Sequence, residues 1–437
     1  MPRQLPPGKT LTLGSVHTLG AAATAGVRAV ITLLVLAAWP GAALHAVETG
    51  SAAAAAGNSV AVEQGRYLAA AGNCLSCHTR PDGAPYSGGV PFVTPLGTLY
   101  STNITPDART GIGAWTALDL QRALQQGRSR DGSHLFPAFP YPAFTKLSDA
   151  DVAALYAFLR TVPAVSYRPP ANGALFAMRW PLALWNSLFF RPGRYVVNPA
   201  RSAEWNRGAY LVQGPGHCGA CHTPRNLLLA ERDDSFLHGG TLQVAVGKDR
   251  ARRWSAVDLT PGKRGLASWS VAELTQYFQK GVSARAGTFG PMNEVIANSL
   301  SVLTPEDLHA MAVYLKSLPP RAYPDETVAP RLASEGAPIY KARCQKCHGS
   351  SGRGGMFSGP PVAGSAIVQS EDPASLINII LHGSDAPRAL ASESWETMPA
   401  YADVLDDAQI AAVSNFLRGS WSNRAGAVTG ASVRAQR

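Results

Sequence analysis

Apolar residues recur at helical spacing in three segments of the chain that align with one another without gaps. These segments are "KLSDADVAALYAFLRTV" (146–162), "VLTPEDLHAMAVYLKSL" (302–318) and "VLDDAQIAAVSNFLRGS" (404–420). Each segment opens with a capping residue: Ser148, Thr304 or Asp406. Three positions later stand Asp151, Asp307 and Gln409. The pattern predicts three N-capped amphipathic helices, with a full capping box only where glutamine is present.

Further repeated segments lie before and between these helices. "EQGRYLAAAGN" (63–73), "NRGAYLVQGPGH" (206–217) and "SEGAPIYKAR" (334–343) share a glycine and a tyrosine. Each predicts a helix that approaches another element closely at its glycine, with an aromatic ring alongside. "NITPDARTGIGAW" (103–115) matches "DLTPGKRGLASW" (258–269), and short helical patterns end at Gly127, Gly281 and Gly383. The chain therefore reads as a mainly α protein built from one repeated unit.

The first 46 residues read as an export signal. A positively charged start is followed by the apolar run "AVITLLVLAAW" (29–39), then by Pro40 and a small residue, Ala46, at a cleavage point. Eleven apolar residues are too few to span a bilayer, so we expect a cleaved signal peptide over 1–46, with an uncleaved anchor as the alternative. An exported, periplasmic protein follows from this interpretation.

Length and charge narrow the class of protein. A chain of 437 residues suggests two to four domains, and its 42 glycines and 33 prolines indicate loop-rich ones. The net charge of +10 is not gathered into a run of five or more Lys and Arg. We interpret it as a solvated basic surface and expect no nucleic-acid partner.

All six cysteines fall in one pattern, C-x-x-C-H. The three copies comprise Cys74, Cys77 and His78; Cys218, Cys221 and His222; and Cys344, Cys347 and His348. A zinc site made from two pairs would leave the third pair and the three histidines unexplained, and a redox dithiol needs no histidine there. Disulfides would not explain the histidines either. The pentapeptide is the attachment signal of c-type haem, in which both thiols bond to the porphyrin and the histidine ligates iron. We therefore predict three covalently bound haems c.

A haem used for electron transfer normally has a second axial ligand, and methionine raises its reduction potential. Met292 lies eleven residues after Gly281, and Met398 lies fifteen after Gly383, each beside a proline. We assign them as iron ligands of the second and third haems. The corresponding position in the first unit is Phe139, which cannot ligate iron. His134, Met178 and an open or water-filled position all remain candidates there.

The apolar segment "MRWPLALWNSLFF" (178–190) lies between the first two units. We expect a buried helix, with a surface that contacts membrane or partner as the alternative. Nothing in the chain resembles a substrate site: there is no nucleotide-binding glycine fingerprint, no H-E-x-x-H and no nucleophile elbow. Whether the protein is itself an enzyme is left open by the residues.

The three C-x-x-C-H motifs, together with "TPLGTLYSTNITPD", "GIGAW", "GPGHCGACHTPR", "WNSLFF" and "MPAY", resemble the tri-haem cytochrome c subunits of bacterial membrane-bound alcohol, gluconate, sorbitol and fructose dehydrogenases. The resemblance covers nearly the whole mature chain. It implies three tandem class I cytochrome c domains, which we place at 58–168, 200–320 and 331–421. Phe139, where the alcohol and gluconate type usually has methionine, is more similar to the cytochrome partners of molybdenum-containing aldehyde and heterocycle dehydrogenases.

The resemblance also implies a function. The protein would take electrons from a catalytic subunit that uses a quinone, flavin or molybdenum cofactor and pass them to ubiquinone, at the periplasmic side of the bacterial inner membrane. Two alternatives stay open: a peroxidase-like haem enzyme that uses an open first haem, and a soluble periplasmic electron shuttle.

Overall fold

The computed structural model describes residues 44–94, 96–247, 250–324, 326–355, 359–384 and 397–437, with side chains from residue 58 onward. The structure is 43% helix and 10% strand, which confirms the mainly α class. By its contacts the chain divides after Ala53, and all three C-x-x-C-H motifs lie in the second unit, Ala54–Arg437. The predicted signal peptide lies outside the described residues except for its last three, which begin helix α1. No helix among the described residues is long and apolar enough to cross a bilayer.

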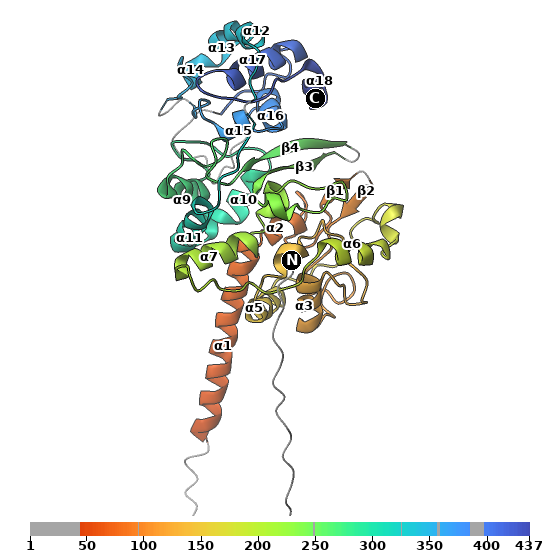
Figure 1. The fold of residues 1–437 in the computed structure, drawn as a ribbon. Helices are drawn as coiled ribbons and strands as arrows, with labels where there is room; N and C mark the ends of the chain where they lie inside the picture. The colour runs from red at the N-terminus through yellow and green to blue at the C-terminus, as the bar shows by residue number, and fades with distance from the viewer. Residues whose placement is uncertain (1–43, 95, 248–249, 325, 356–358, 385–396) are drawn as a thin grey trace, which may run out of the picture. The chain divides into compact units, whose positions relative to one another are not determined.

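We call residues 58–168, 200–320 and 331–421 repeats 1, 2 and 3 (Figure 1). The elements of repeat 1 are α1 (Leu44–Ala71), α2 (Cys74–His78), β1 (Pro91–Thr94), β2 (Gly97–Tyr100), α3 (Ala117–Gln126), α4 (Tyr141–Phe144) and α5 (Asp149–Leu159). A connecting segment comes next, with η1 (Ala174–Ala177) and α6 (Pro181–Phe189).

Repeat 2 contains α7 (Ala203–Gln213), α8 (Gly219–His222), η2 (Asp233–Ser235), β3 (His238–Val246), β4 (Arg250–Asp258), α9 (Val271–Lys280), α10 (Met292–Asn298), η3 (Leu300–Val302) and α11 (Pro305–Lys316). Repeat 3 contains α12 (Pro330–Glu335), α13 (Ala337–Arg343), α14 (Gln345–His348), α15 (Ala366–Gln369), α16 (Ala374–His382) and α17 (Asp407–Gly419), and α18 (Gly430–Arg434) comes after it. Helices α5, α11 and α17 confirm the three predicted from the apolar spacing.

Three hydrophobic cores form among the described residues, and each is centred on one repeat. Leu124 and Phe158 belong to the core of repeat 1, Leu274 and Leu308 to that of repeat 2, and Ile380 and Ile410 to that of repeat 3. The core of repeat 3 also takes Val433 of α18, beyond residue 421. Each attachment segment therefore lies beside a core of its own.

The first and last helices of each repeat cross at the shared glycine. A Cβ on Gly65 would lie 1.9 Å from the carbonyl oxygen of Ala154. The same contact recurs between Gly208 and Ala310 at 1.9 Å, and between Gly336 and Ala412 at 2.1 Å. No side chain fits at such a distance, so the close approach predicted from sequence is confirmed in all three repeats.

The helix caps also follow the sequence pattern. The side chains of Ser148 and Thr304 each accept a hydrogen bond from the backbone N–H three residues on, and Asp406 does so within a complete capping box with Gln409. The short helices α3, α9 and α16 end at the predicted glycines, each with positive φ: Gly127, Gly281 and Gly383.

Two features differ from the sequence-based expectation. Two antiparallel hairpins, β1–β2 and β3–β4, were not predicted. The strands of the first are only four residues long, too short for a clear alternation of apolar and polar side chains. The expectation of a buried helix over 178–190 is wrong for one face, because Trp180 is 75% exposed and Leu184 62% exposed. Apolar composition alone could not tell a buried helix from a half-exposed one.

We predict that Gly208→Ala destabilises the protein. Alanine is the better helix former by about 1 kcal/mol, but its Cβ would meet the Ala310 carbonyl, and overpacking of this kind costs about 1–3 kcal/mol or more. A lower midpoint of thermal or urea unfolding would show this. Gly193→Ala is the matched control, since no atom of the described residues lies within 4 Å of a Cβ there. Equal midpoints for the two variants would contradict the crossing.

Candidate functional site

Each C-x-x-C-H motif lies on about one turn of helix, within α2, α8 or α14 or immediately before it. In repeat 2 the N–H of His222 bonds to the carbonyl of Cys218 at 2.9 Å, and in repeat 3 that of His348 bonds to Cys344 at 3.0 Å. Residues three and four apart on a helix share a face. The turn therefore directs two thiols and an imidazole toward the same side.

The three histidines of the motifs are held in the same way. The Nδ1 atom of His78 lies 2.7 Å from the carbonyl oxygen of Thr102. For His222 the partner is the carbonyl of Val257 at 2.7 Å, and for His348 it is that of Pro360 at 2.8 Å. A carbonyl only accepts, so Nδ1 carries the proton and Nε2 keeps its lone pair.

These histidines are also kept neutral. Burial lowers the pKa of His78, His222 and His348, and the bond to the carbonyl only partly offsets this. A neutral imidazole with Nδ1 tied to a backbone carbonyl is the usual arrangement of a histidine that ligates a metal through Nε2. All three are therefore suited to bind iron.

The carbonyl acceptors were missed by the sequence analysis, although a signal was present. Thr102 and Val257 each stand directly before one of the matched segments, "NITPD" and "DLTPG". The first residue of each segment, Asn103 or Asp258, is buried and accepts a bond from the N–H two residues on. This turn fixes the loop that presents the carbonyl to the histidine.

The cysteines are not arranged as reactive thiolates. Burial raises the pKa of Cys74 and of Cys218 to about 12, and that of Cys344 to about 11. A redox dithiol or catalytic cysteine needs a lowered pKa, so the environment does not suit that chemistry.

A cavity of about 470 Å³ adjoins the third motif. Cys344, His348 and Met398 line it together, so the predicted thioether, imidazole and methionine sulfur meet at one space. The rest of the lining is largely apolar, with the cationic residues Lys280, Arg285 and Arg343. Its size lies in the range of cofactor sites, roughly 300–1,000 Å³, and its chemistry suits an apolar porphyrin that carries propionates. A haem held here supplies an iron that gains or loses one electron.

Met292 begins α10 and is partly buried against the core of repeat 2, as is Cys218. Its role as an iron ligand stays a prediction.

Repeat 1 has Phe139 at the position where the sequence pattern of the other two repeats has methionine. Phe139 packs against the core that also contacts Cys74, with its ring 5.4 Å from that of Phe144. Met178 is 50% exposed at the end of η1. His134 contacts Asn186, whose amide nitrogen lies 2.8 Å from its Nδ1. Since an amide nitrogen only donates, Nδ1 of His134 accepts and Nε2 carries the proton, the opposite of the three motif histidines.

Comparisons with known proteins agree with this geometry. The family described as "Cytochrome c" matches residues 62–163, and the one described as "Cytochrome C oxidase, cbb3-type, subunit III" matches residues 331–417. The chain is 38% identical over 402 residues to the cytochrome c subunit of the quinone alcohol dehydrogenase of Gluconacetobacter polyoxogenes, covering 86% of this chain and 84% of the relative. It is 38% identical over 387 residues to the gluconate 2-dehydrogenase cytochrome c subunit of Pantoea cypripedii, covering 84% and 87%. It is 41% identical over 363 residues to a nicotinate dehydrogenase subunit of Pseudomonas putida, covering 79% of this chain but 29% of that protein.

Helical repeats with attachment cysteines and a neutral proximal histidine define a c-type cytochrome, a protein that transfers electrons through covalently bound haem. Within that class, the chain belongs to the family of dehydrogenase cytochrome c subunits.

We predict that Met398→His lowers the reduction potential of one haem. Imidazole stabilises ferric iron relative to a thioether, and the shift should be on the order of 0.1 V within the ~0.8 V that axial ligands span. A potentiometric titration followed by absorption measures it. Met311→Leu is the control, because Met311 is 2% exposed within α11 and is assigned to packing. Unchanged potentials in the Met398 variant would remove Met398 as a ligand.

Proposed function

We propose that the chain is a tri-haem electron-transfer subunit composed of three tandem class I cytochrome c domains at 58–168, 200–320 and 331–421. The observation that carries this proposal is the bond from histidine Nδ1 to a backbone carbonyl, which recurs in all three C-x-x-C-H motifs. An equivalent ligand in each repeat supports one haem at each. The axial ligands would be His78; His222 with Met292; and His348 with Met398.

Haem content tests the number. Full-length protein matured in a host that attaches haem c should give three equivalents in a pyridine haemochrome assay after denaturation. Replacing Cys344 and Cys347 by alanine should lower this to two, because only one attachment site is lost. Fewer than three equivalents in the parent, or no loss in the variant, would contradict the proposal.

The partner is a catalytic dehydrogenase subunit, and the acceptor is ubiquinone. The support is that relatives over most of this chain are named as subunits of dehydrogenases, one of them a quinone alcohol dehydrogenase. The phenylalanine at position 139, which resembles the cytochrome partners of molybdenum-containing dehydrogenases, favours a molybdenum-type partner over a quinone- or flavin-type one. Mild-detergent co-purification from membranes with mass spectrometry would identify the partner.

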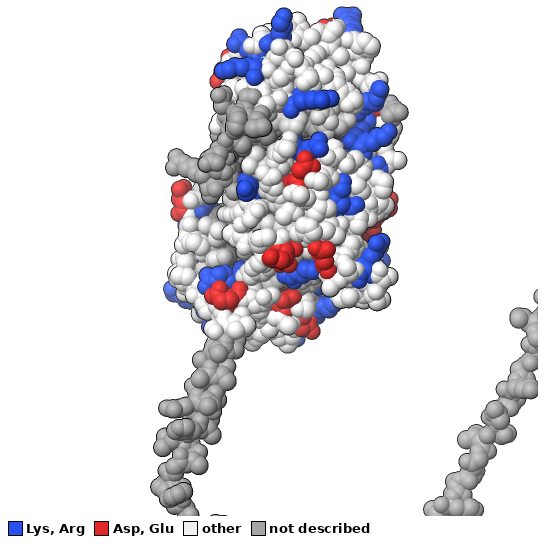
Figure 2. Space-filling model, turned by 90° about the vertical axis from the view of Figure 1, so that its left-hand side faces the viewer, with Lys and Arg blue, Asp and Glu red and all other residues white. Residues whose placement is uncertain are grey.

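The surface around α6 supports a location at the periplasmic face of the inner membrane. Trp180, Leu184 and Leu188 recur every four residues and are 75%, 62% and 52% exposed, so they form one apolar face. Arg179 and Arg191 flank this face, and no Asp or Glu occurs between Asp151 and Glu204. Apolar and aromatic residues beside arginines suit the surface of an anionic bilayer. Elsewhere, as on the face in Figure 2, positive and negative side chains are interspersed.

We predict that Leu184→Ser with Leu188→Ser weakens binding to phosphatidylglycerol vesicles roughly tenfold or more, since the lost apolar contact is worth about 1.5 kcal/mol or more. Vesicle co-sedimentation measures this. Val302→Ser is the control, because Val302 is 56% exposed but lies in η3, outside the α6 segment. If the parent does not bind vesicles, the soluble shuttle is favoured instead.

Phe139 supports a second candidate function, a haem enzyme with an open first site. A high-spin ferric signal from one haem, together with cyanide binding, would favour it. Three low-spin haems that do not bind cyanide would contradict this enzymatic function.

A further inference from the structure

Two tyrosines at equivalent positions of repeats 1 and 2 reach into each other's repeats. Tyr67 of α1 and Tyr210 of α7 each stand two residues after the crossing glycine. The hydroxyl of Tyr67 donates to the Asp307 carboxylate at 2.5 Å and accepts from the N–H of Thr304 at 3.2 Å. Its target is thus the start of α11 in repeat 2.

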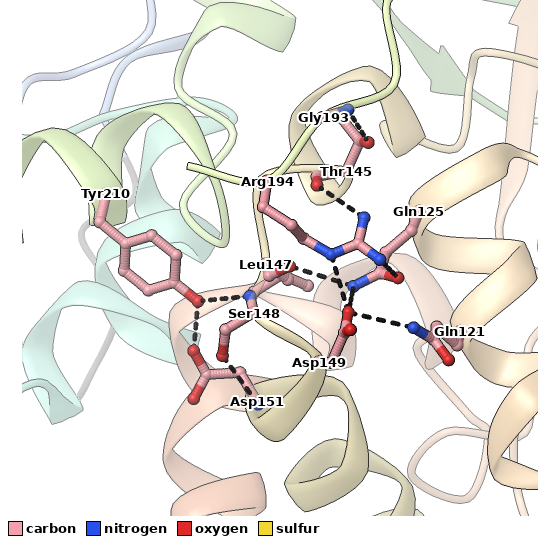
Figure 3. A network of polar contacts seen from close by, with 10 residues as sticks. All are labelled: Gln121, Gln125, Thr145, Leu147, Ser148, Asp149, Asp151, Gly193, Arg194 and Tyr210. Atoms are coloured by element: carbon pink, nitrogen blue, oxygen red, sulfur yellow. Dashed lines mark hydrogen bonds and ion pairs between the residues drawn. The ribbon is translucent and has the colours of Figure 1, made fainter. Parts of the chain in front are cut away.

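Tyr210 makes the same pair of contacts in the opposite direction. Its hydroxyl donates to the Asp151 carboxylate and lies 3.4 Å from the N–H of Ser148, at the start of α5 in repeat 1 (Figure 3). The tyrosine of each repeat therefore contacts the start of the last helix of the other repeat, and the two contacts are equivalent. Reciprocity of this kind defines a two-fold, isologous contact.

In repeats 1 and 2 a tyrosine hydroxyl accepts the hydrogen bond of the N-cap N–H, which a side chain three residues on accepts in a complete capping box. In repeat 3 the Gln409 side chain bonds back to the N–H of Asp406 and completes the box. In repeats 1 and 2 the N-cap N–H bonds instead to the tyrosine of the other repeat, and the aspartate accepts from the same hydroxyl. Repeat 3 has Pro338 and Gln409 at the tyrosine and aspartate positions, so it lacks both halves of this contact.

The protonation states suit the contact. Burial, together with Asp307, raises the pKa of Tyr67, which keeps the hydroxyl protonated as a donor. Burial alone would raise the pKa of Asp307, but Arg207 and Tyr67 bind it and bring its pKa below the usual value.

Each of the two tyrosines also packs against the hydrophobic core of the other repeat. Tyr67 packs against the core of repeat 2, and Ala71, 3% exposed, belongs to that core. Tyr210 packs against the core of repeat 1. The segment before repeat 2 is tied down as well: Arg194 pairs with Asp149 at 2.8 Å, and the N–H of Gly193 bonds to Thr145 at 2.9 Å (Figure 3).

The haem-attachment segments lie within this contact. His217, directly before Cys218, has its Nε2 3.2 Å from the carbonyl of Gly72, two residues before Cys74. Ser76, inside the first motif, accepts from the Asn298 amide of α10 at 2.9 Å.

We infer that Tyr67 and Tyr210 are positioning residues that hold repeats 1 and 2 as a pseudo-symmetric pair, with their attachment segments in contact, so that the first two haems exchange electrons directly. In each exchange one electron leaves one iron and arrives at the other, and no bond is made or broken. The inference rests on the proposed function in one respect, the presence of a haem at both motifs.

Amide hydrogen exchange tests the docking by itself. Tyr67→Phe should speed exchange roughly tenfold or more in a peptide that covers 302–307 and leave 146–151 unchanged, because only the Thr304 N–H loses its acceptor. Tyr210→Phe should do the reverse. A peptide covering 404–409 is the internal control in every sample, since its capping box lies within repeat 3.

Electron paramagnetic resonance of the oxidised protein tests the haem pair. In the parent, two ferric signals should be broadened by each other, and the double Tyr67→Phe, Tyr210→Phe variant should lose this broadening. Tyr314→Phe is the matched control, because its buried hydroxyl bonds to Gln213 within repeat 2.

Unchanged exchange in both tyrosine variants would overturn the docking. Faster exchange with unchanged broadening in the double variant would overturn the positioning role of Tyr67 and Tyr210, and a parent with no mutual broadening would overturn the direct pair. A haemochrome value below three would instead contradict the tri-haem function, and the exchange measurement would still decide the docking.

Discussion

The hydrogen bond from a buried imidazole to a single backbone carbonyl is the constraint on which the site depends. It fixes the tautomer, so that Nε2 is available as a ligand, and it orients the ring against the side chains around it. The carbonyl can do this only if its loop is held in place. In the first two repeats the side chains of Asn103 and Asp258 hold this loop, because each accepts a hydrogen bond from the backbone N–H two residues on. A motif of five residues therefore needs a second segment, some 24 or 35 positions away, to become a site.

In each repeat the first and last helices cross so closely that no side chain fits at the crossing point. Gly65, Gly208 and Gly336 let the first helix of each repeat rest against the backbone of the last one. The residue two positions after this glycine differs between the repeats. In repeats 1 and 2 that residue is a tyrosine, and it bonds to the other repeat. Repeat 3 has proline there and closes its own cap, so it does not make this tyrosine contact.

The far side of each site is where the repeats differ in chemistry. Repeat 3 brings Met398 into the same cavity as His348, whereas repeat 1 has Phe139 packed into its core. A thioether sulfur can ligate iron and a phenyl ring cannot, so the two repeats present different chemistry at this position.

Much of this protein was determined by the sequence alone. Apolar spacing and capping residues predicted α5, α11 and α17, and the shared glycines predicted the close crossings, because helix periodicity and the absence of a Cβ are local properties. The six cysteines and three histidines identified the cofactor chemistry for the same reason. Tertiary structure decided which carbonyl each histidine meets, which face of 178–190 is exposed, and that Tyr67 and Tyr210 bond across repeats rather than within them. These outcomes depend on distances between segments up to 240 residues apart, and no local pattern encodes such a distance.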